Sequence, residues 1–288
     1  MAASITEGFI DTERLRLFAL RSQPTQSHGR VLLLGGSNFD LHLKRQFLDT
    51  ALAQRFEITT YEPRGIGRSD QPDGDWQMED YALDALALMD AIGWPSANVI
   101  GESFGGMTAL HLALMAPDRV GYLAIASAAA GGDGGASFDI SAHLGLPAKE
   151  AATKALCLQD TANRTLQASD PPAFQARLEE RLAFDKAFAD PSVTSGGYAR
   201  LLAARARHDV WERVPDIQHD TTVITGTRDE QAPLQAQRAL ANRLRHGRHW
   251  QYDGGHGVAF TQKAVMEDLC ALWCDGLGQH TEKGERHG

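Results

Sequence analysis

The sequence is poor in cysteine. Its 288 residues include three, Cys157, Cys270 and Cys274. An odd and sparse set does not make a disulfide framework, so we expect the fold to depend on a buried core. Cys270 and Cys274 lie four residues apart in a segment with helical spacing, and we interpret them as small buried apolar side chains.

Long apolar runs are also missing. No stretch approaches the length of about eighteen apolar residues that crosses a bilayer. The first residues, MAASI, lack the basic stretch followed by an apolar one that is typical of a secretory leader. We therefore expect a soluble, cytoplasmic protein without a membrane partner.

Positive charge is scarce relative to negative charge, with 28 lysines and arginines against 37 aspartates and glutamates. The resulting net charge of -9 would repel nucleic-acid phosphates, so we expect no nucleic-acid partner. A content of 43% hydrophobic residues is ordinary for a globular protein. The length indicates one large domain, or a domain with an inserted lid. The composition indicates neither a cofactor nor a particular oligomeric state.

Short apolar runs alternate with longer amphipathic segments along most of the chain. Such alternation predicts an α/β fold with a mostly parallel, doubly wound sheet covered on both faces. The segments 8–10 and 15–20, joined by a polar turn, predict an antiparallel hairpin at one edge of this sheet. The other expected strands lie near 31–34, 56–61, 98–100, 122–126, 222–225 and 250–252, and the expected helices near 40–54, 77–92, 104–115, 232–244 and 261–275.

The alternation stops between residues 131 and 212. This stretch opens with GGDGG and then carries helical patterns near 174–188 and 198–207, without a strand pattern. We predict that 131–212 is a helical cap inserted into a core made of 1–130 and 213–278. The polar residues 279–288 are expected to be a disordered tail.

The strongest chemical signal is the sequence GESFG at 101–105, placed between an expected strand and an expected helix. A sharp turn there would lift the hydroxyl of Ser103 above the sheet at a helix N-terminus, as a nucleophile requires. We predict that side chains at Gly101 and Gly105 would not fit. The alternative is a Gly-rich turn without chemistry.

A serine hydroxyl needs a base, and His256 follows the last strand in the sequence GGHG. Its place at the carboxyl end of a strand is where open α/β sheets build their sites. His246 and His249 are three residues apart, but no other ligands cluster with them, so we expect no metal site.

A third residue should fix the tautomer of the histidine. Asp229, after the strand at 222–225, is the preferred candidate, because the order Ser, Asp, His is typical of hydrolases. Glu230 and Asp133 are the alternatives. The backbone N–H groups of Phe104 and Ser37 are the expected donors of an oxyanion hole.

Together these residues resemble the α/β-hydrolase superfamily, over nearly the whole chain from Gly8 to about Leu277. PRGIGRS at 63–69 is similar to a loop of that family, PDRV at 117–120 resembles its link into the next strand, and 131–212 matches its cap position. Two positions depart from the family. Gly35 replaces a common histidine, which implies a different support for the oxyanion loop, and Glu62 replaces an aspartate.

The resemblance implies a capped esterase or enol-lactonase that cleaves a small carboxylic ester, lactone or thioester through an acyl-enzyme. Ser103 distinguishes the chain from haloalkane dehalogenases and epoxide hydrolases, which use an aspartate. The alternatives are an acyltransferase or carbon–carbon bond hydrolase on the same triad, and a receptor or signalling partner on the same scaffold.

The predicted cap offers side chains for an acyl pocket, with lid core as the alternative for its aromatic residues and a solvated helix face as the alternative for its arginines. An arginine could also pair with a substrate carboxylate. The candidates are Gly36 from the core, the aromatic residues Phe174, Phe184, Phe188, Tyr198 and Trp211, and the arginines Arg200, Arg205 and Arg207.

Overall fold

The computed structural model describes residues 3–284, with the side chains of 190–191 and 276–284 left out of the description. An eight-stranded sheet forms its centre, in the order β1-β2-β4-β3-β5-β6-β7-β8. The hairpin β1–β2 and the pair β2–β4 are antiparallel, and the other pairs are parallel. The strands are β1 (Ser4–Asp11), β2 (Arg16–Gln23), β3 (Arg30–Leu34), β4 (Glu57–Tyr61), β5 (Ala97–Glu102), β6 (Val120–Ala126), β7 (Thr221–Gly226) and β8 (Gly247–Tyr252).

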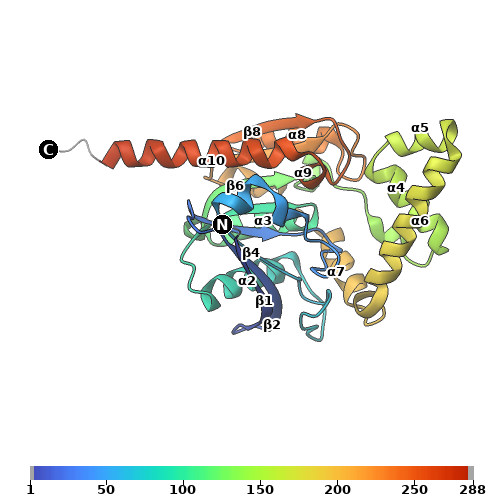
Figure 1. Ribbon diagram of the computed structural model, residues 1–288, viewed down its shortest axis with the longest axis horizontal. Helices are drawn as coiled ribbons and strands as arrows, with labels where there is room; N and C mark the ends of the chain where they lie inside the picture. The colour runs from blue at the N-terminus through green and yellow to red at the C-terminus, as the bar shows by residue number, and fades with distance from the viewer. Residues whose placement is uncertain (1–2, 285–288) are drawn as a thin grey trace.

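Helices cover both faces of this sheet, as the alternation of the sequence predicts (Figure 1). Short helical turns at 46–49, 117–119, 132–134, 140–143, 189–193 and 211–216 complete the connections. The helices are α1 (Ala51–Arg55), α2 (Met78–Ala91), α3 (Phe104–Met115), α4 (Ala148–Gln159), α5 (Ala162–Ser169), α6 (Pro171–Phe188), α7 (Gly197–Ala206), α8 (Leu234–Arg243), α9 (Val258–Thr261) and α10 (Lys263–Gly284).

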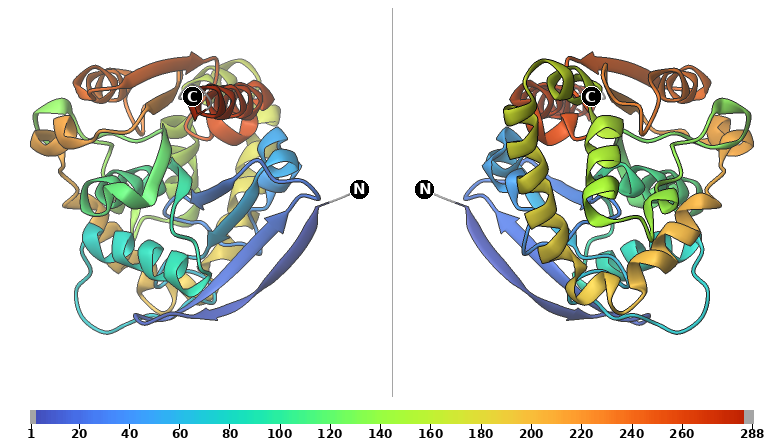
Figure 2. Two further views of the ribbon diagram at one scale, coloured as in Figure 1. Left: turned by 90° about the vertical axis from the view of Figure 1, so that its left-hand side faces the viewer. Right: turned by 90° about the vertical axis from the view of Figure 1, so that its right-hand side faces the viewer.

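Each buried strand contributes to two cores, because successive side chains point to opposite faces of the sheet. In β3, Leu32 and Leu34 belong to the core that also contains side chains of α2, α3 and α8. Val31 and Leu33 belong to the core that contains side chains of α1, α9 and α10. The runs that are apolar throughout are therefore explained by burial on both sides. The predicted hairpin at the edge of the sheet is confirmed (Figure 2).

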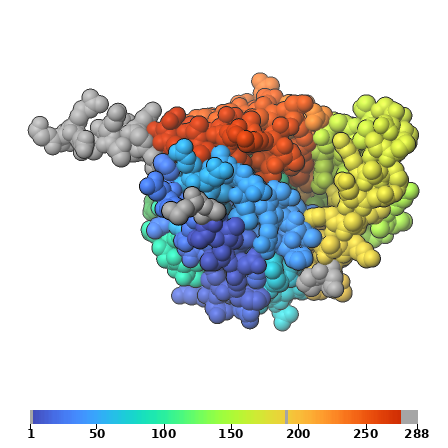
Figure 3. Space-filling view, in the orientation of Figure 1, coloured from blue at the N-terminus to red at the C-terminus, as the bar shows by residue number. Residues whose placement is uncertain are grey.

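Helices α4–α7, which we call the cap, are inserted between β6 and β7, and no strand occurs among the described residues of this insertion. The cap stands at the end of the molecule toward which the parallel strands point (Figures 1 and 3). Whether the cap ends at residues 131 and 212, as the sequence predicts, stays a prediction.

The C-terminal helix is longer than the sequence indicates. Helix α10 continues through 279–284, which we expected to be disordered, and the rest of that expected tail, 285–288, lies outside the described residues. No helix in the described part of the chain is both long and apolar enough to span a membrane.

Candidate active site

Ser103 lies at the sharp turn between β5 and α3, with φ 55° and ψ -115°. The turn brings α3 so close to the sheet that side chains are excluded on both sides of the serine. A Cβ at Gly101 would lie 2.3 Å from the carbonyl oxygen of Gly105, and a Cβ at Gly105 would lie 2.0 Å from that of Leu34. The two glycines of the GESFG sequence are therefore required by the close approach.

Three buried side chains on separate loops are joined by hydrogen bonds. The hydroxyl of Ser103 lies 2.8 Å from Nε2 of His256, and Nδ1 of His256 lies 2.9 Å from Oδ2 of Asp229. The other carboxylate oxygen of Asp229 accepts from the backbone N–H of Ala232 at 2.9 Å. This order lets the aspartate fix the histidine with Nδ1 protonated and Nε2 available to accept the serine proton.

The alternative acids lie elsewhere. The side chain of Glu230 is exposed and pairs with Arg164 across the surface. That pair, led by the hydrogen bond from Arg164, lowers the pKa of the Glu230 carboxyl. Asp133 is exposed on the short helical turn at 132–134. Of the three candidate acids, the structure brings Asp229 to His256.

The loop after β3 lies beside the serine. A Cβ built at Gly36 would be 3.7 Å from Cβ of Ser103, so the backbone of this loop passes close to the nucleophilic position. Ser37 is the next residue and is buried. Phe104 is the first residue of α3, where a backbone N–H has no partner within the helix. Both expected oxyanion donors thus flank Ser103, and their role stays a prediction.

Two departures from the family pattern support this loop. The ring of Phe39 packs on Gly35, where a Cβ would lie 1.9 Å from the ring, so a histidine at position 35 would not fit. The buried carboxylate of Glu62 accepts from the backbone N–H of Leu41 at 3.0 Å and from that of Arg68 at 2.6 Å. Glu62 thereby ties the end of the oxyanion loop to the loop that follows β4.

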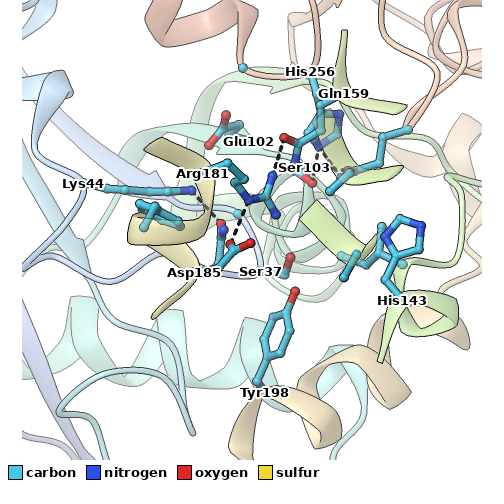
Figure 4. Close-up of a pocket in the computed structure, with 18 of the residues that line it drawn as sticks. Ser37, Lys44, Glu102, Ser103, His143, Gln159, Arg181, Asp185, Tyr198 and His256 are labelled. Carbon is cyan, nitrogen blue, oxygen red and sulfur yellow. Dashed lines mark hydrogen bonds and ion pairs between the residues drawn. The ribbon is translucent and has the colours of Figure 1, made fainter. Parts of the chain in front are cut away.

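A cavity of about 370 Å³ opens above Ser103, between the core loops and the cap (Figure 4). Its wall combines a few apolar side chains with many polar and charged ones. The polar and charged members include Asn38, Lys44, Glu102, Gln159, Arg181, Asp185, Tyr198 and Gln231.

Three of the expected pocket residues line this cavity, namely Gly36, Phe184 and Tyr198. Burial raises the pKa of the Tyr198 hydroxyl, which points toward Ser37 in Figure 4. Phe174 and Trp211 do not line this cavity.

The aromatic candidates that do not line the cavity pack against other side chains instead. Phe174 joins Leu178 in a small core within the cap, because it faces α4 across the helix pair. Trp211 packs against Gly134 and under the guanidinium of Arg243. Phe188 is buried and meets the ring of Tyr198 edge-on.

The cationic residues of the cavity are not those that the sequence suggested. Arg200, Arg205 and Arg207 donate to the carbonyl oxygens of Pro72, Phe138 and Trp76, outside the cavity. Lys44 and Arg181 line it instead. The sequence carries no pattern for either, because each reaches the cavity from an element whose placement depends on tertiary contacts.

The ammonium of Lys44 donates to Oδ1 of Asn38 at 2.6 Å. Burial lowers the pKa of Lys44, and the more distant charge of Glu102 acts in the opposite direction. Arg181, in contrast, pairs with Asp185 at 2.8 Å. A charged wall of this kind is suited to a small polar molecule.

Comparison with known proteins gives a family match and several relatives. The family model described as alpha/beta hydrolase fold matches residues 29–263. A protein of Caulobacter segnis described as carbamate hydrolase RutD is 31% identical over 241 residues, which are 78% of this chain and 84% of that protein. The 2-hydroxymuconate semialdehyde hydrolase of Pseudomonas putida is 29% identical over 184 residues, 62% of each chain.

A solved structure shows the same fold. The enol-lactonase from Burkholderia xenovorans LB400 matches with a TM-score of 0.73 at 22% identity, covering 92% of this chain and 99% of that one.

Proposed function

Because this chain belongs to the alpha/beta hydrolase fold family, we propose that it is a serine hydrolase that cleaves a small, polar acyl compound through an acyl-enzyme. The observation that carries the proposal is the buried chain of hydrogen bonds from Ser103 through His256 to Asp229. Distances of 2.8 and 2.9 Å are within the reach that proton transfer requires.

The reaction would proceed in two halves. Ser103 Oγ attacks the carbonyl carbon while Nε2 of His256 takes the hydroxyl proton. The N–H groups of Phe104 and Ser37 would hold the oxyanion, and the leaving group departs with the proton from His256. A water molecule, deprotonated by His256, then releases the acid and restores Ser103.

The cavity favours a substrate with polar or charged groups. Lys44, Glu102, Arg181 and Asp185 line a space of about 370 Å³, which is small for a long apolar acyl chain. We propose an ester, lactone or thioester as the substrate class. The relative described as a carbamate hydrolase adds the carbamate, which presents a similar carbonyl to the same serine.

A carbon–carbon bond hydrolase is the second candidate. It is favoured by the likeness to the 2-hydroxymuconate semialdehyde hydrolase, which covers 62% of each chain. Product analysis distinguishes an ester hydrolase from a carbon–carbon bond hydrolase. Ester cleavage releases an alcohol, whereas carbon–carbon cleavage releases a fragment that carries a new C–H bond. Added alcohols or thiols would report an acyltransferase by trapping the acyl group.

The first experiment is labelling with a fluorophosphonate probe, followed by a panel of small esters, lactones, thioesters and carbamates. We expect the wild type to be labelled and to turn over some of the panel. Ser103→Ala should not be labelled, and its kcat should fall by a factor on the order of 10⁶. A Ser103→Ala variant with wild-type turnover would contradict the assignment, and labelling without turnover would favour a receptor.

A further inference from the structure

The C-terminal end of α4 in the cap is bonded to both loops that carry the base and the acid. Its backbone makes three hydrogen bonds to these loops, His256 N to Gln159 O at 2.6 Å, Glu230 N to Leu158 O at 3.1 Å and Thr161 N to Arg228 O at 3.0 Å. An ion pair between Asp160 and Arg228 at 2.8 Å adds to them. The approach is close enough that a Cβ at Gly255 would lie 2.3 Å from the carbonyl oxygen of Gln159.

Side chains extend this contact into the active site. Nη1 of Arg181 donates to Oε1 of Gln159 at 3.0 Å, and Nε2 of Gln159 donates to Oε1 of Gln231 at 3.4 Å. Nε2 of Gln231 lies 2.7 Å from Nε2 of His256. We call Arg181, Gln159 and Gln231 the relay, and all three line the cavity above Ser103. Figure 4 shows Arg181 and Gln159 beside each other near His256.

Arg181, at the end of the relay farthest from His256, sets the donor-to-acceptor direction of its hydrogen bonds. A guanidinium only donates hydrogen bonds, so Arg181 requires the oxygen of Gln159 to face it. The nitrogen of Gln159 then faces Gln231 and requires the oxygen of Gln231 in turn. The nitrogen of Gln231 is left to face Nε2 of His256, so Gln231 and the hydroxyl of Ser103 share the single lone pair of that ring nitrogen.

A donor at Nε2 favours the neutral imidazole with its proton on Nδ1. That tautomer is the one that Asp229 accepts from, and the one that can act as a base toward Ser103. An imidazolium would place an N–H against the N–H of Gln231 at 2.7 Å, which is unfavourable. Turning Gln231 around would break its bond to Gln159.

From this geometry we infer that the relay of Arg181, Gln159 and Gln231 couples the cap to the proposed catalytic histidine. It holds the resting His256 in its neutral tautomer with the proton on Nδ1, and Gln231 must move away when Nε2 takes the proton of Ser103. Gln159 and Gln231 are positioning residues, since they act on Ser103 through His256. The inference rests on the proposed serine hydrolase. It also extends the role expected for the cap, from which the sequence predicted only side chains for an acyl pocket.

The test is the rate of labelling by a fluorophosphonate probe between roughly pH 5 and pH 9, because this rate needs a neutral histidine and no known substrate. In Gln231→Leu, the acidic limb of the labelling rate against pH should move to higher pH by about half a unit to one unit. This shift corresponds to the free energy of one hydrogen bond. Gln159→Leu interrupts the relay without changing the charge and should move the limb in the same direction. The double variant should move it no further than Gln231→Leu, because the two side chains act in series.

Gln237→Leu is the matched control. Gln237 is a buried glutamine that bonds the carbonyl of Ala232 on the same loop at 2.6 Å, but it does not line the cavity. The acidic limb of the labelling rate of Gln237→Leu should stay at the wild-type pH. A folded Gln231→Leu or Gln159→Leu protein with an unmoved or lowered limb would overturn the relay while leaving the hydrolase in place. A wild type that the probe does not label would contradict the hydrolase, and the relay with it.

Discussion

Ser103 adopts a backbone conformation that is rare for residues other than glycine, with φ 55°. Such strain persists only where the surroundings hold it, and here β5 and α3 fix both neighbours of the serine. As a result, the buried hydroxyl of Ser103 points at His256 and lies 2.8 Å from its Nε2. At this scale, the proposed chemistry depends on a few atoms held by rigid elements.

Asp229 should contribute through the tautomer and charge of His256. Asp229→Asn should lower kcat by a factor on the order of 10⁴, less than the loss in Ser103→Ala. Turnover of the best ester from the panel is the measurement.

Glu230→Gln is the control for this substitution, because Glu230 is the adjacent residue and pairs with Arg164 at the surface. It should leave kcat within about a factor of two, since exposed ion pairs contribute little. The choice of acid would be wrong if Glu230→Gln were crippling and Asp229→Asn were neutral.

At the scale of elements, the contact between α3 and β3 decides whether the turn at Ser103 can form. Gly105→Ala should lower the free energy of unfolding by about 1–3 kcal/mol or more, because the new Cβ would meet the carbonyl oxygen of Leu34 at 2.0 Å. It should also abolish fluorophosphonate labelling. Urea unfolding and probe labelling measure the two effects.

The control is Gly8→Ala in β1, where a new Cβ meets nothing within 4 Å. Its stability and labelling should match those of the wild type. Full labelling of Gly105→Ala would show that the close packing of α3 is not what positions Ser103.

The cap elements should select the substrate through the side chains that reach the cavity. Phe184→Ala enlarges the cavity and should change the ratio of kcat/KM between a short and a longer acyl group by about tenfold. Phe174→Ala is the matched control, because it lies in the small core of the cap. It should reduce the melting temperature without changing that ratio, and equal effects on all acyl groups in Phe184→Ala would contradict the role of this side chain.

At the scale of the whole molecule, stability should depend on pH through a buried histidine pair. His208 lies between His111, at 3.2 Å, and the carbonyl of Ala129, at 3.0 Å. Burial lowers the pKa of His208 to about 3, and the charge of His111 acts in the same direction. The pair joins α3 to the segment after α7, so its protonation should affect the whole fold.

An unfolded histidine titrates near pH 6.5, so between about pH 6.5 and pH 3 the unfolded chain binds a proton that the folded chain does not. The contribution of His208 is therefore complete above about pH 6.5 and is lost as the pH falls. The free energy of unfolding should decrease by up to about 1.4 kcal/mol for each pH unit in this range.

Urea unfolding at pH 7.5 and pH 4.5 measures this loss. His208→Gln keeps a donor for the carbonyl of Ala129 but does not titrate, so it should reduce the pH dependence. His246→Gln, at an exposed position, should leave the dependence unchanged. If the free energy of unfolding of His208→Gln depended on pH as that of the wild type does, His208 would not be the cause of the dependence.

The sequence by itself determined the class of fold, because both the apolar runs and the glycines report local requirements. Runs such as 31–34 are apolar throughout since both faces of β3 are buried. The strand-to-helix setting of Ser103 could be recognised in the sequence because Gly101 and Gly105 flank the serine within one short segment. The close approaches that require these glycines involve Gly105 itself and the more distant Leu34. The preference for Asp229 followed from its place after a strand and from the chain order Ser, Asp, His.

Only the tertiary structure decided what surrounds the serine. Phe174 and Phe184 have the same residue type and lie on the same helix, yet one faces the core of the cap and the other the cavity. Gln159, Arg181 and Gln231 come from three separate segments and form a chain of contacts that ends at His256, because α4 docks on the loops that carry His256 and Asp229. Packing between distant elements has no local period, so no spacing in the sequence could have indicated these side chains.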